Sequence, residues 1–470
     1  MKTLALQALL VILSAAIFAR LEPAVFAADR PNILLITADD LGNQLSCYGD
    51  RRLQTPRLDR LAAQGVRFTR AFVTQSSCSS SRSSILTGLY PHQNGQYGLA
   101  HLGFSMHPGQ TTLPALLKKA GYRTGIIGKL HVEPKADFPF DWKPKDKGTA
   151  AGPTRNVHWV TEQSREFFAS AEKSRRPFFY YVNYFDPHGP YTPDVRQVAG
   201  LPEQPLDPEK VAPLPLRAPE PEARRRITAL IYDCIARVDT GTGLLLDELD
   251  AAGLAANTLV IFLGDNGACV RHGKCSSYEP GVQVPLLMRW PDRAKPGQVR
   301  DELVSMVDLM PTILEAAGIA VPEKLAGRSL QPLLRGEEGS PWREYLFTEM
   351  NFHTANMYRP QRTIRDDRFK LLLDLAPNAD QAEMELYDLE NDLGETKNLA
   401  DDPAYADERR RLESALQDWR QRNDDPLLDA ARLKRWTQVA AKWKDSAPRL
   451  DRGPYPDVAR VPPGELDLLK

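Results

Sequence analysis

The chain has 470 residues, of which 42% are hydrophobic and 26% charged, and its formal net charge is −1 at pH 7. This length exceeds one compact core and favours two domains. The near-zero charge provides no basic surface for nucleic acid or anionic membranes, so neither is expected as a partner.

The N-terminus has the pattern of a secretory signal. Lys2 precedes an apolar run over residues 4–19, and residues 25–28 form a small-residue cleavage pattern. We predict a signal peptide over residues 1–27. A single membrane anchor is the alternative, but the run is short for a span and Arg20 ends it. The mature protein is expected to be periplasmic or secreted, with no membrane segment after cleavage.

Strands and helices alternate through the first two thirds of the chain. Helices are expected at 55–65, 78–88, 112–120, 222–252 and 306–317, and strands at 32–38, 66–73, 123–128, 177–184, 258–263 and 284–290. Residues 135–160 and 189–221 are rich in proline and polar groups and are predicted to be long surface loops. The alternation predicts an α/β fold, a large and mostly parallel sheet sandwiched by helices.

The pattern changes after residue 338. Short strands at 345–349, 363–365, 369–373 and 385–389 precede an expected helix at 403–420. We therefore divide the mature chain into a larger domain over 28–338 and a C-terminal α+β subdomain over 339–470, which contains an antiparallel sheet. The tail from about Leu427 is expected to pack on the surface.

Polar residues follow four of the expected strands. The carboxyl ends of strands form the ligand-binding edge of open α/β sheets, so these residues are candidates for one site. They are Asp39, Asp40, Lys129, His131, His188, Asp265 and Asn266.

The acidic and amide members of this set predict a cation site. Asp39, Asp40, Asp265 and Asn266 offer only oxygen ligands, which favours a hard cation, Ca²⁺ more than Mg²⁺. Asp265 and Asn266 also suit an ordinary turn, whereas two adjacent carboxylates at a strand end are costly without a cation.

Cys78 stands where a helix should begin, and Arg82 follows it on the same helical face. A helix N-terminus favours a nucleophile or an anion, although a plain N-cap is the local alternative. The five cysteines are an odd number, so in an oxidising compartment at least one stays unpaired. Cys269 and Cys275 are close enough in sequence to bridge, and free thiols are equally expected there.

Basic side chains can surround the same edge of the sheet. Lys129 and His131 are two residues apart and point the same way in an extended chain. Together with Arg82, Lys274 and His188 they would form a cationic ring able to hold a mono- or dianionic oxyester.

In order and spacing these motifs resemble the type I sulfatase family, which has an alkaline-phosphatase-like fold. The resemblance rests on Asp39-Asp40, residues 78–82 followed by 84–88, Gly128-Lys129, Asp186-Pro187-His188, Asp265-Asn266-Gly267 with Lys274, and residues 386–388. Within this family the chain most resembles the N-sulfoglucosamine sulfohydrolases (heparan N-sulfatase, sulfamidase), through residues 91–95, 97–99 and 122–132.

The resemblance implies that residues 28–338 are a sulfatase catalytic domain and that a maturation enzyme oxidises Cys78 to formylglycine. One hydroxyl of the aldehyde hydrate, bound to Ca²⁺, would attack sulfur, and loss of the proton from the second would expel sulfate. Arg82 would hold the hydrate, while Lys129, His131 and Lys274 would bind sulfate oxygens. His188 would protonate the leaving atom, with His131 alternatively assisting the hydrate.

The resemblance also implies a substrate, the N-sulfoglucosamine of heparan- or heparin-type glycans, and a homodimer. Substrate-binding residues would be His92, His101, His353 and Arg362. Two positions depart from the family pattern. Ser80 stands where the modification signature has proline, which concerns conversion of Cys78, and Thr354 stands where an acidic residue is expected, which concerns specificity.

Three other functions stay open at this point. The first is an O-sulfatase acting on another sulfated glycan or on aryl sulfates. The second is a phosphoester hydrolase of the same fold. The third is a non-catalytic sulfoglycan-binding protein in which Cys78 remains a thiol.

Overall fold

The computed structural model describes residues 30–145, 153–191, 205–216, 220–337, 339, 341–377, 383–448 and 458–469. The expected signal peptide lies outside these ranges, as do parts of both expected loops. Within them, no helix is long and apolar enough to cross a membrane. No disulfide joins any of the five cysteines, all of which lie in these ranges.

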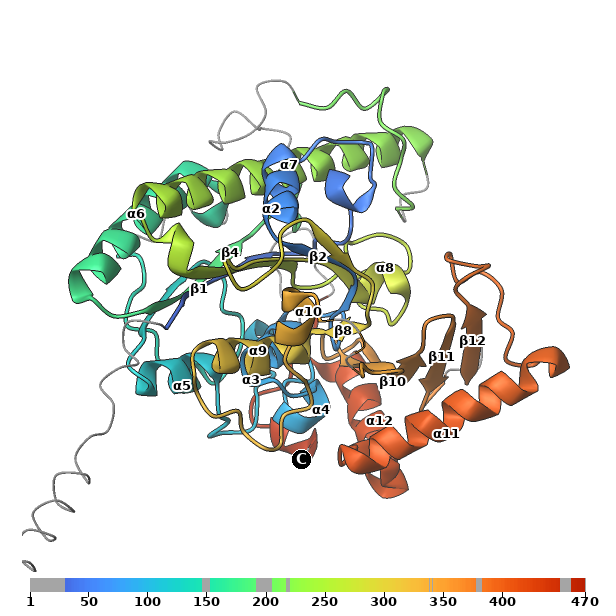
Figure 1. The fold of residues 1–470 in the computed structure, drawn as a ribbon. Coiled ribbons are helices and arrows are strands. Elements are labelled where there is room, and N and C mark those ends of the chain that lie inside the picture. Colours follow the sequence, from blue (N-terminus) through green and yellow to red (C-terminus); the bar gives the residue numbers. More distant parts are fainter. Residues whose placement is uncertain are drawn as a thin grey trace, which may run out of the picture.

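A large sheet of eight strands forms the centre of the molecule (Figure 1), in the order β3-β4-β1-β5-β6-β2-β7 with β8 beside β2. Strands β3, β4, β1 and β5 are parallel, whereas β6 is antiparallel to both β5 and β2. The mostly parallel sheet is therefore confirmed. The strands are β1 (Asn32–Ala38), β2 (Val66–Phe72), β3 (Arg123–Ile127), β4 (Phe178–Tyr184), β5 (Thr258–Gly264), β6 (Gln283–Arg289), β7 (Gln298–Arg300) and β8 (Val304–Ser305).

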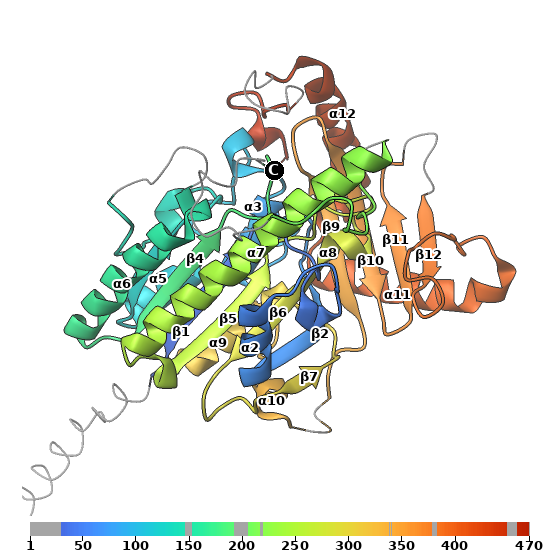
Figure 2. The same ribbon diagram turned by 90° about the horizontal axis from the view of Figure 1, so that it is seen from above.

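Helices cover both faces of this sheet (Figures 1 and 2). One face carries α2 (Pro56–Gln64), α6 (Val157–Ser174) and α7 (Pro221–Ala251). The other carries α3 (Cys78–Thr87), α5 (Leu113–Lys119), α9 (Leu309–Ala316) and α10 (Gln331–Arg335). The short helices α4 (Pro91–Asn94) and α8 (Glu279–Val282) lie in connections between these elements.

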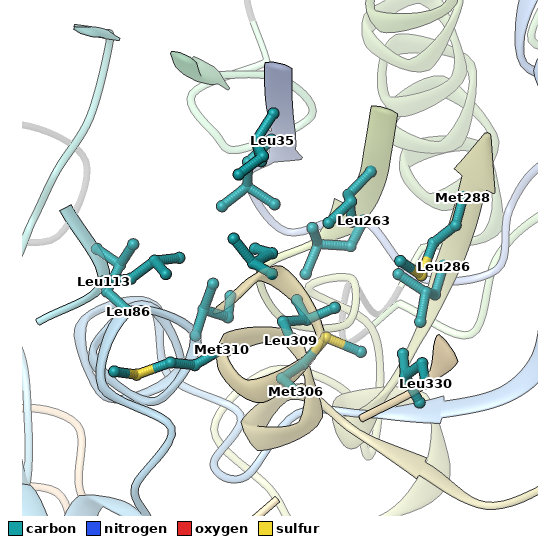
Figure 3. Close-up of a cluster of buried hydrophobic side chains, with 14 of the residues drawn as sticks. Leu35, Leu86, Leu113, Leu263, Leu286, Met288, Met306, Leu309, Met310 and Leu330 are labelled. Atoms are coloured by element: carbon teal, nitrogen blue, oxygen red, sulfur yellow. The ribbon is translucent and has the colours of Figure 1, made fainter. Parts of the chain in front are cut away.

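The two layers have separate hydrophobic cores because side chains alternate across a strand. In β1, Ile33 and Leu35 pack into the cluster beneath α3, α5 and α9, part of which Figure 3 shows, whereas Leu34 and Ile36 pack against α6 and α7. Both faces of the central strand are thus buried, as its continuous apolar run predicts.

Helix α6 corrects the sequence interpretation. The loop expected at 135–160 ends inside this helix, and the helix itself was not among the predicted elements. Val157, Val160, Phe167, Phe168 and Ala171 recur at helical spacing and are buried against the sheet. The proline-rich composition just before Val157 concealed that periodicity.

The C-terminal subdomain contains the expected antiparallel sheet, in the order β12-β11-β10-β9. Its strands are β9 (Leu346–Phe352), β10 (Tyr358–Arg365), β11 (Phe369–Asp374) and β12 (Met384–Asp388). Helix α11 (Ala406–Arg422) buries Leu412, Leu416 and Trp419 against this sheet.

The tail is a second correction, because it does not simply pack on the surface. It forms helix α12 (Ala430–Ser446), whose Trp436 and Trp443 are fully buried. These rings, seven residues apart on one helical face, pack with Tyr97, Phe104 and Phe352. The tail therefore joins the first part of the chain to the C-terminal sheet.

Candidate active site

The four expected cation ligands meet where β1 and β5 end, because the two strands pair in parallel up to their last residues. The backbone N–H of Asp40 donates to Oδ1 of Asp265 at 3.0 Å, and Nδ2 of Asn266 donates to Oδ1 of Asp40 at 2.9 Å. Asp39 lies beside them, and all four side chains are buried. Asp40 has a φ of 64°, an uncommon conformation for a residue other than glycine and one found at functional sites.

Cys78 begins helix α3, as expected, and its side chain faces these carboxylates. The Sγ atom lies 3.4 Å from Oδ1 of Asp39 and 3.9 Å from Oδ1 of Asp40. Burial, followed by the charge of Asp39, raises the pKa of this thiol well above its usual value. The unmodified side chain therefore stays a protonated thiol, which is a weak nucleophile.

Arg82, one helical turn after Cys78, extends under the same cluster and is fully buried. Its Nε donates to Oδ2 of Asp265 at 2.8 Å, and its Nη1 donates to the carbonyl of Lys129 at 2.9 Å. Lys129 is presented by Gly128, which has a φ of 88°; a Cβ there would lie only 2.3 Å from the carbonyl oxygen of Asn183. The glycine before the lysine is thus required by the backbone and by the close packing of β4.

Two lysines complete the ion pairs of the pocket. Lys129 Nζ lies 2.5 Å from Oδ2 of Asp39, and Lys274 Nζ lies 2.7 Å from Oδ1 of Asp40. Although burial opposes ionisation of Asp39, the charges of Lys129, His188 and Arg82 hold its pKa well below its usual value. Asp39 is therefore ionised and is balanced by neighbouring cations, whereas burial and then the charge of Asp39 raise the pKa of Asp265 to about 6.

The donor set fits a divalent cation. Oδ1 of Asn266 is buried and has no hydrogen-bond partner among the described residues. Ligand atoms of Asp39, Asp40, Cys78 and His188 lie within 4.8 Å of one another. Three buried carboxylates and an amide oxygen are typical of a Ca²⁺ site, and the added charge would turn a roughly neutral pocket into one that attracts anions.

His131 and His101 form a stacked pair where the buried cluster reaches the surface at the exposed His101, here called the opening of the pocket. Nδ1 of His101 lies 2.6 Å from Nε2 of His131, and the ring centroids are 4.8 Å apart. The other ring nitrogen of His131, Nδ1, is buried without a hydrogen-bond partner in the described part of the chain, as is Nη2 of Arg82. Buried polar atoms left without partners indicate where a polar ligand binds.

His188 reaches the pocket from the loop after β4. Its Nδ1 lies 2.5 Å from the carbonyl oxygen of Gly189, and its Nε2 lies 3.9 Å from Oδ2 of Asp40. Burial lowers the pKa of His188, while Asp40 acts in the opposite direction. The loop is anchored by Asp186, which pairs with Arg237 and lies 3.2 Å from Nη1 of Arg155.

The four expected substrate-binding residues separate into two groups. His101 lies at the exposed opening, and His353 lies next to the nucleophile segment, with its Nδ1 3.0 Å from Oγ of Ser77. The structure does not bring His92 and Arg362 to the pocket surface, which corrects the sequence expectation. Both side chains are fully buried.

These two buried residues are used in structural ion pairs. His92 pairs with Glu349 and its Nε2 lies 3.0 Å from the carbonyl oxygen of Asn423. Arg362 makes a two-bond contact with Asp425, at 2.8 and 2.9 Å. Their polar atoms are therefore occupied by protein groups and support the subdomain behind the pocket.

The sequence analysis missed residues that hold the site from behind. Oδ1 of Asn183 accepts from Nη1 of Arg82 at 2.5 Å and from Oγ1 of Thr37 at 2.7 Å. A lone amide inside the apolar strand β4 was a signal that could have identified it. Arg155 and Arg237 pair with Asp186 but lie far from Asp186 in the sequence. No local sequence pattern therefore marks these two arginines as part of the site.

Comparison with known proteins gives a consistent result. The Sulfatase family model matches residues 31–319, and a model described as N-sulphoglucosamine sulphohydrolase, C-terminal, matches residues 271–422. Human (Homo sapiens) N-sulphoglucosamine sulphohydrolase is 34% identical, with 85% of this chain and 92% of the relative covered.

Solved structures share the fold at lower identity. One, of a protein in complex with its substrate D-glucosamine-2-N,6-O-disulfate, has a TM-score of 0.68 and 24% identity, covering 84% of this chain and 98% of the other. A phosphonate monoester hydrolase from Silicibacter pomeroyi has the same TM-score and identity, covering 85% and 97%. The alkaline-phosphatase-like architecture is confirmed. The chain belongs to the sulfatase family and is a hydrolase of sulfate esters or N-sulfates.

Proposed function

We propose that the protein is a formylglycine- and Ca²⁺-dependent sulfatase that removes the N-sulfate from N-sulfoglucosamine in heparan- or heparin-type glycans. The position of Cys78 carries this proposal, 3.4 Å from Asp39 at the edge of a buried set of carboxylates and cations. A formylglycine hydrate at this position would supply a hydroxyl nucleophile and a second hydroxyl that permits sulfate release. The raised pKa of the thiol makes unmodified Cys78 a weak nucleophile.

Asp39, Asp40, Asp265 and Asn266 are the residues that would hold Ca²⁺. Their oxygens converge from two strand ends, and the free Oδ1 of Asn266 is suited to this role. The cation would supply positive charge next to the reacting sulfate.

The chain's own cations would bind and orient the sulfate. Lys129 and Lys274 present ammonium groups beside Cys78, and the unpartnered Nη2 of Arg82 and Nδ1 of His131 can donate to sulfate oxygens. Charge-assisted hydrogen bonds of this kind stabilise negative charge as it develops in the transition state.

His188 is suited to protonate the leaving nitrogen. Its Nδ1–H donates to the carbonyl of Gly189, which fixes the ring and leaves Nε2 facing the pocket. When the ring is protonated at both nitrogens, the form that the charge of Asp40 favours, the Nε2 proton can pass to the leaving nitrogen as the S–N bond breaks, so that the sugar leaves as an amine and His188 becomes neutral. Asp186 and its two arginines keep this loop in position.

The substrate assignment rests on the C-terminal subdomain. The match to the N-sulphoglucosamine sulphohydrolase C-terminal model includes His353, which lies beside Ser77 at the pocket. We further propose a periplasmic or secreted location, conversion of Cys78 by a formylglycine-generating maturation enzyme, and a homodimer. The N-terminal pattern and the resemblance to sulfamidases support these points.

A substrate panel tests the proposal. The protein, co-expressed with a formylglycine-generating enzyme, is assayed on N-sulfoglucosamine, glucosamine 6-O-sulfate, 4-nitrophenyl sulfate and 4-nitrophenyl phosphate. We expect the highest kcat/KM on N-sulfoglucosamine, and its loss in His188→Asn but not in His158→Asn, which changes an exposed histidine on α6.

Other outcomes of the panel assign the alternatives. Release from O-sulfates alone would make the protein an O-sulfatase, and faster phosphate release would make it a phosphoester hydrolase. A protein whose Cys78 remains a thiol and that binds sulfated sugars without hydrolysing any substrate would be a glycan-binding protein.

A further inference from the structure

The last described segment of the chain passes along the opening of the pocket. The backbone N–H of Val461 donates to the carbonyl of Leu102 at 2.8 Å, and the N–H of Ala355 donates to the carbonyl of Ala459 at 3.1 Å. Val458 packs against the small cluster formed by Cys78, Leu99 and Leu102. Residues 458–461, here called the rim segment, therefore lie between the turn that carries His101 and the turn after His353.

Arg460 is the exposed residue of this rim segment. Ala459 and Val461 on either side are 0% and 7% exposed, so the extended chain directs the arginine side chain away from the core. No ion pair or side-chain hydrogen bond joins Arg460 to another residue in the described ranges. Its guanidinium is thus available to a ligand.

His101 is a titratable neighbour on which the charge of Arg460 acts. Burial, Lys129 and then Arg460 lower the pKa of His101 to about 4, so His101 is neutral at neutral pH. Arg460 also borders a hollow of about 370 Å³ lined by Gly103, Pro448 and residues 461–464. There is therefore space beside the arginine for part of a ligand.

We propose that Arg460 is a specificity-determining residue that binds a second anionic group of the sugar substrate, a sulfate or carboxylate other than the group being hydrolysed. The inference rests on the proposed function and deepens it. The scissile sulfate is assigned to Lys129, Lys274 and Arg82 at the buried end of the pocket and to Nδ1 of His131. Arg460 lies outside that set, on a segment joined to the opening by backbone hydrogen bonds, and an exposed guanidinium recognises either kind of anion.

Binding to a catalytically inactive protein provides the test. In a Cys78→Ala background, calorimetry compares N-sulfoglucosamine with N-sulfoglucosamine 6-O-sulfate and with N-sulfoglucosamine linked to a uronic acid. We expect at least one doubly anionic ligand to bind about fivefold or more tightly than the singly sulfated one, and added salt to reduce the difference. The arm that shows the preference identifies sulfate or carboxylate as the second anion.

Substitution of Arg460 then tests whether this residue causes the preference for the doubly anionic ligand. Arg460→Gln should remove it while leaving affinity for N-sulfoglucosamine unchanged, and Arg460→Lys should restore part of it. Lys434→Gln, which removes an exposed charge from α12, is the matched control and should bind like the parent.

Three results would overturn the inference. The first is an equal loss of affinity for all ligands in Arg460→Gln, and the second is a preference that survives the substitution. The third is a parent protein that binds singly and doubly anionic sugars equally. If the parent binds none of the sugars, the proposed glycan substrate fails as well, which distinguishes failure of the proposed function from failure of this inference alone.

Discussion

The buried end of the pocket and its opening are built in different ways. At the buried end, strand termini and helix α3 position the carboxylates, Cys78 and Arg82, and each charged group contacts several partners. At the opening, His101, His353 and Arg460 come from three distant segments and are exposed or half-buried. Under the proposed function, the reaction class would depend on the fold around the large sheet, whereas substrate choice would depend on how the C-terminal segments pack onto it.

Removal of the nucleophile should have the largest effect. Cys78→Ala is expected to lower kcat by about 10⁴-fold or more, because no other described side chain in the pocket offers a nucleophile in this position. Circular dichroism should show an unchanged fold. Cys47→Ala, which removes a free thiol outside the pocket, is the control. Full turnover in the Cys78 variant would remove this residue from the chemistry.

Removal of the cation should affect both activity and stability. We expect a calcium chelator to abolish turnover, and Ca²⁺ at about 100 times its Kd to stabilise the folded protein by about 2.7 kcal/mol. Asp265→Asn should lose this shift in thermal melting, whereas Asp247→Asn, which changes an exposed carboxylate on α7, should keep it. If the melting temperature of the parent protein is the same with and without Ca²⁺, the cation site is contradicted.

A substitution of Arg362 tests whether this residue stabilises the fold or contacts the substrate. Arg362→Leu removes the two-bond partner of buried Asp425 and leaves it only the ion pair with Arg420, so the variant should be destabilised by about 3 kcal/mol, measured by urea unfolding. The KM of the remaining folded enzyme should change little. The exposed pair of Arg410 with Asp407 offers the control, since Arg410→Leu should alter stability only slightly. A large rise in KM with unchanged stability would return Arg362 to the substrate-binding set.

Ser80 gives the smallest expected effect on the folded protein. Ser80→Pro restores the usual modification signature and should raise the fraction of Cys78 converted to formylglycine. It removes a hydrogen bond from Gln75 to the serine hydroxyl at 3.0 Å, at a cost of about 1 kcal/mol. Ser79→Ala also loses one such bond without creating the signature, so its converted fraction should match the parent. Equal conversion in all three proteins would show that position 80 is not limiting.

Much of the architecture could be predicted because local signals agreed with the fold. The apolar run of β1 and the two carboxylates after it are adjacent in sequence, so their place at the sheet edge followed from strand direction alone. The helix that begins at Cys78 was marked in the same way, by position and by the glycine at its end. The C-terminal sheet was also expected from its short alternating strands.

Other features depended on tertiary packing that no local pattern specifies. Helix α12 follows a charged stretch, and its two tryptophans become core residues only because Phe104 and Phe352 pack against them. Likewise, histidine and arginine are common in binding sites, so His92 and Arg362 were expected to contact substrate. Only their buried partners Glu349 and Asp425 show that they have a structural role.

The most direct test of the account is the chemical state of Cys78 measured together with turnover. Mass spectrometry of the peptide that contains this residue reports thiol or aldehyde in protein produced with and without a formylglycine-generating enzyme. The account predicts that sulfate release from N-sulfoglucosamine rises in proportion to the aldehyde fraction and is absent from fully thiol protein. Equal turnover by thiol-only protein, or none by fully converted protein on any sulfated substrate, would contradict it.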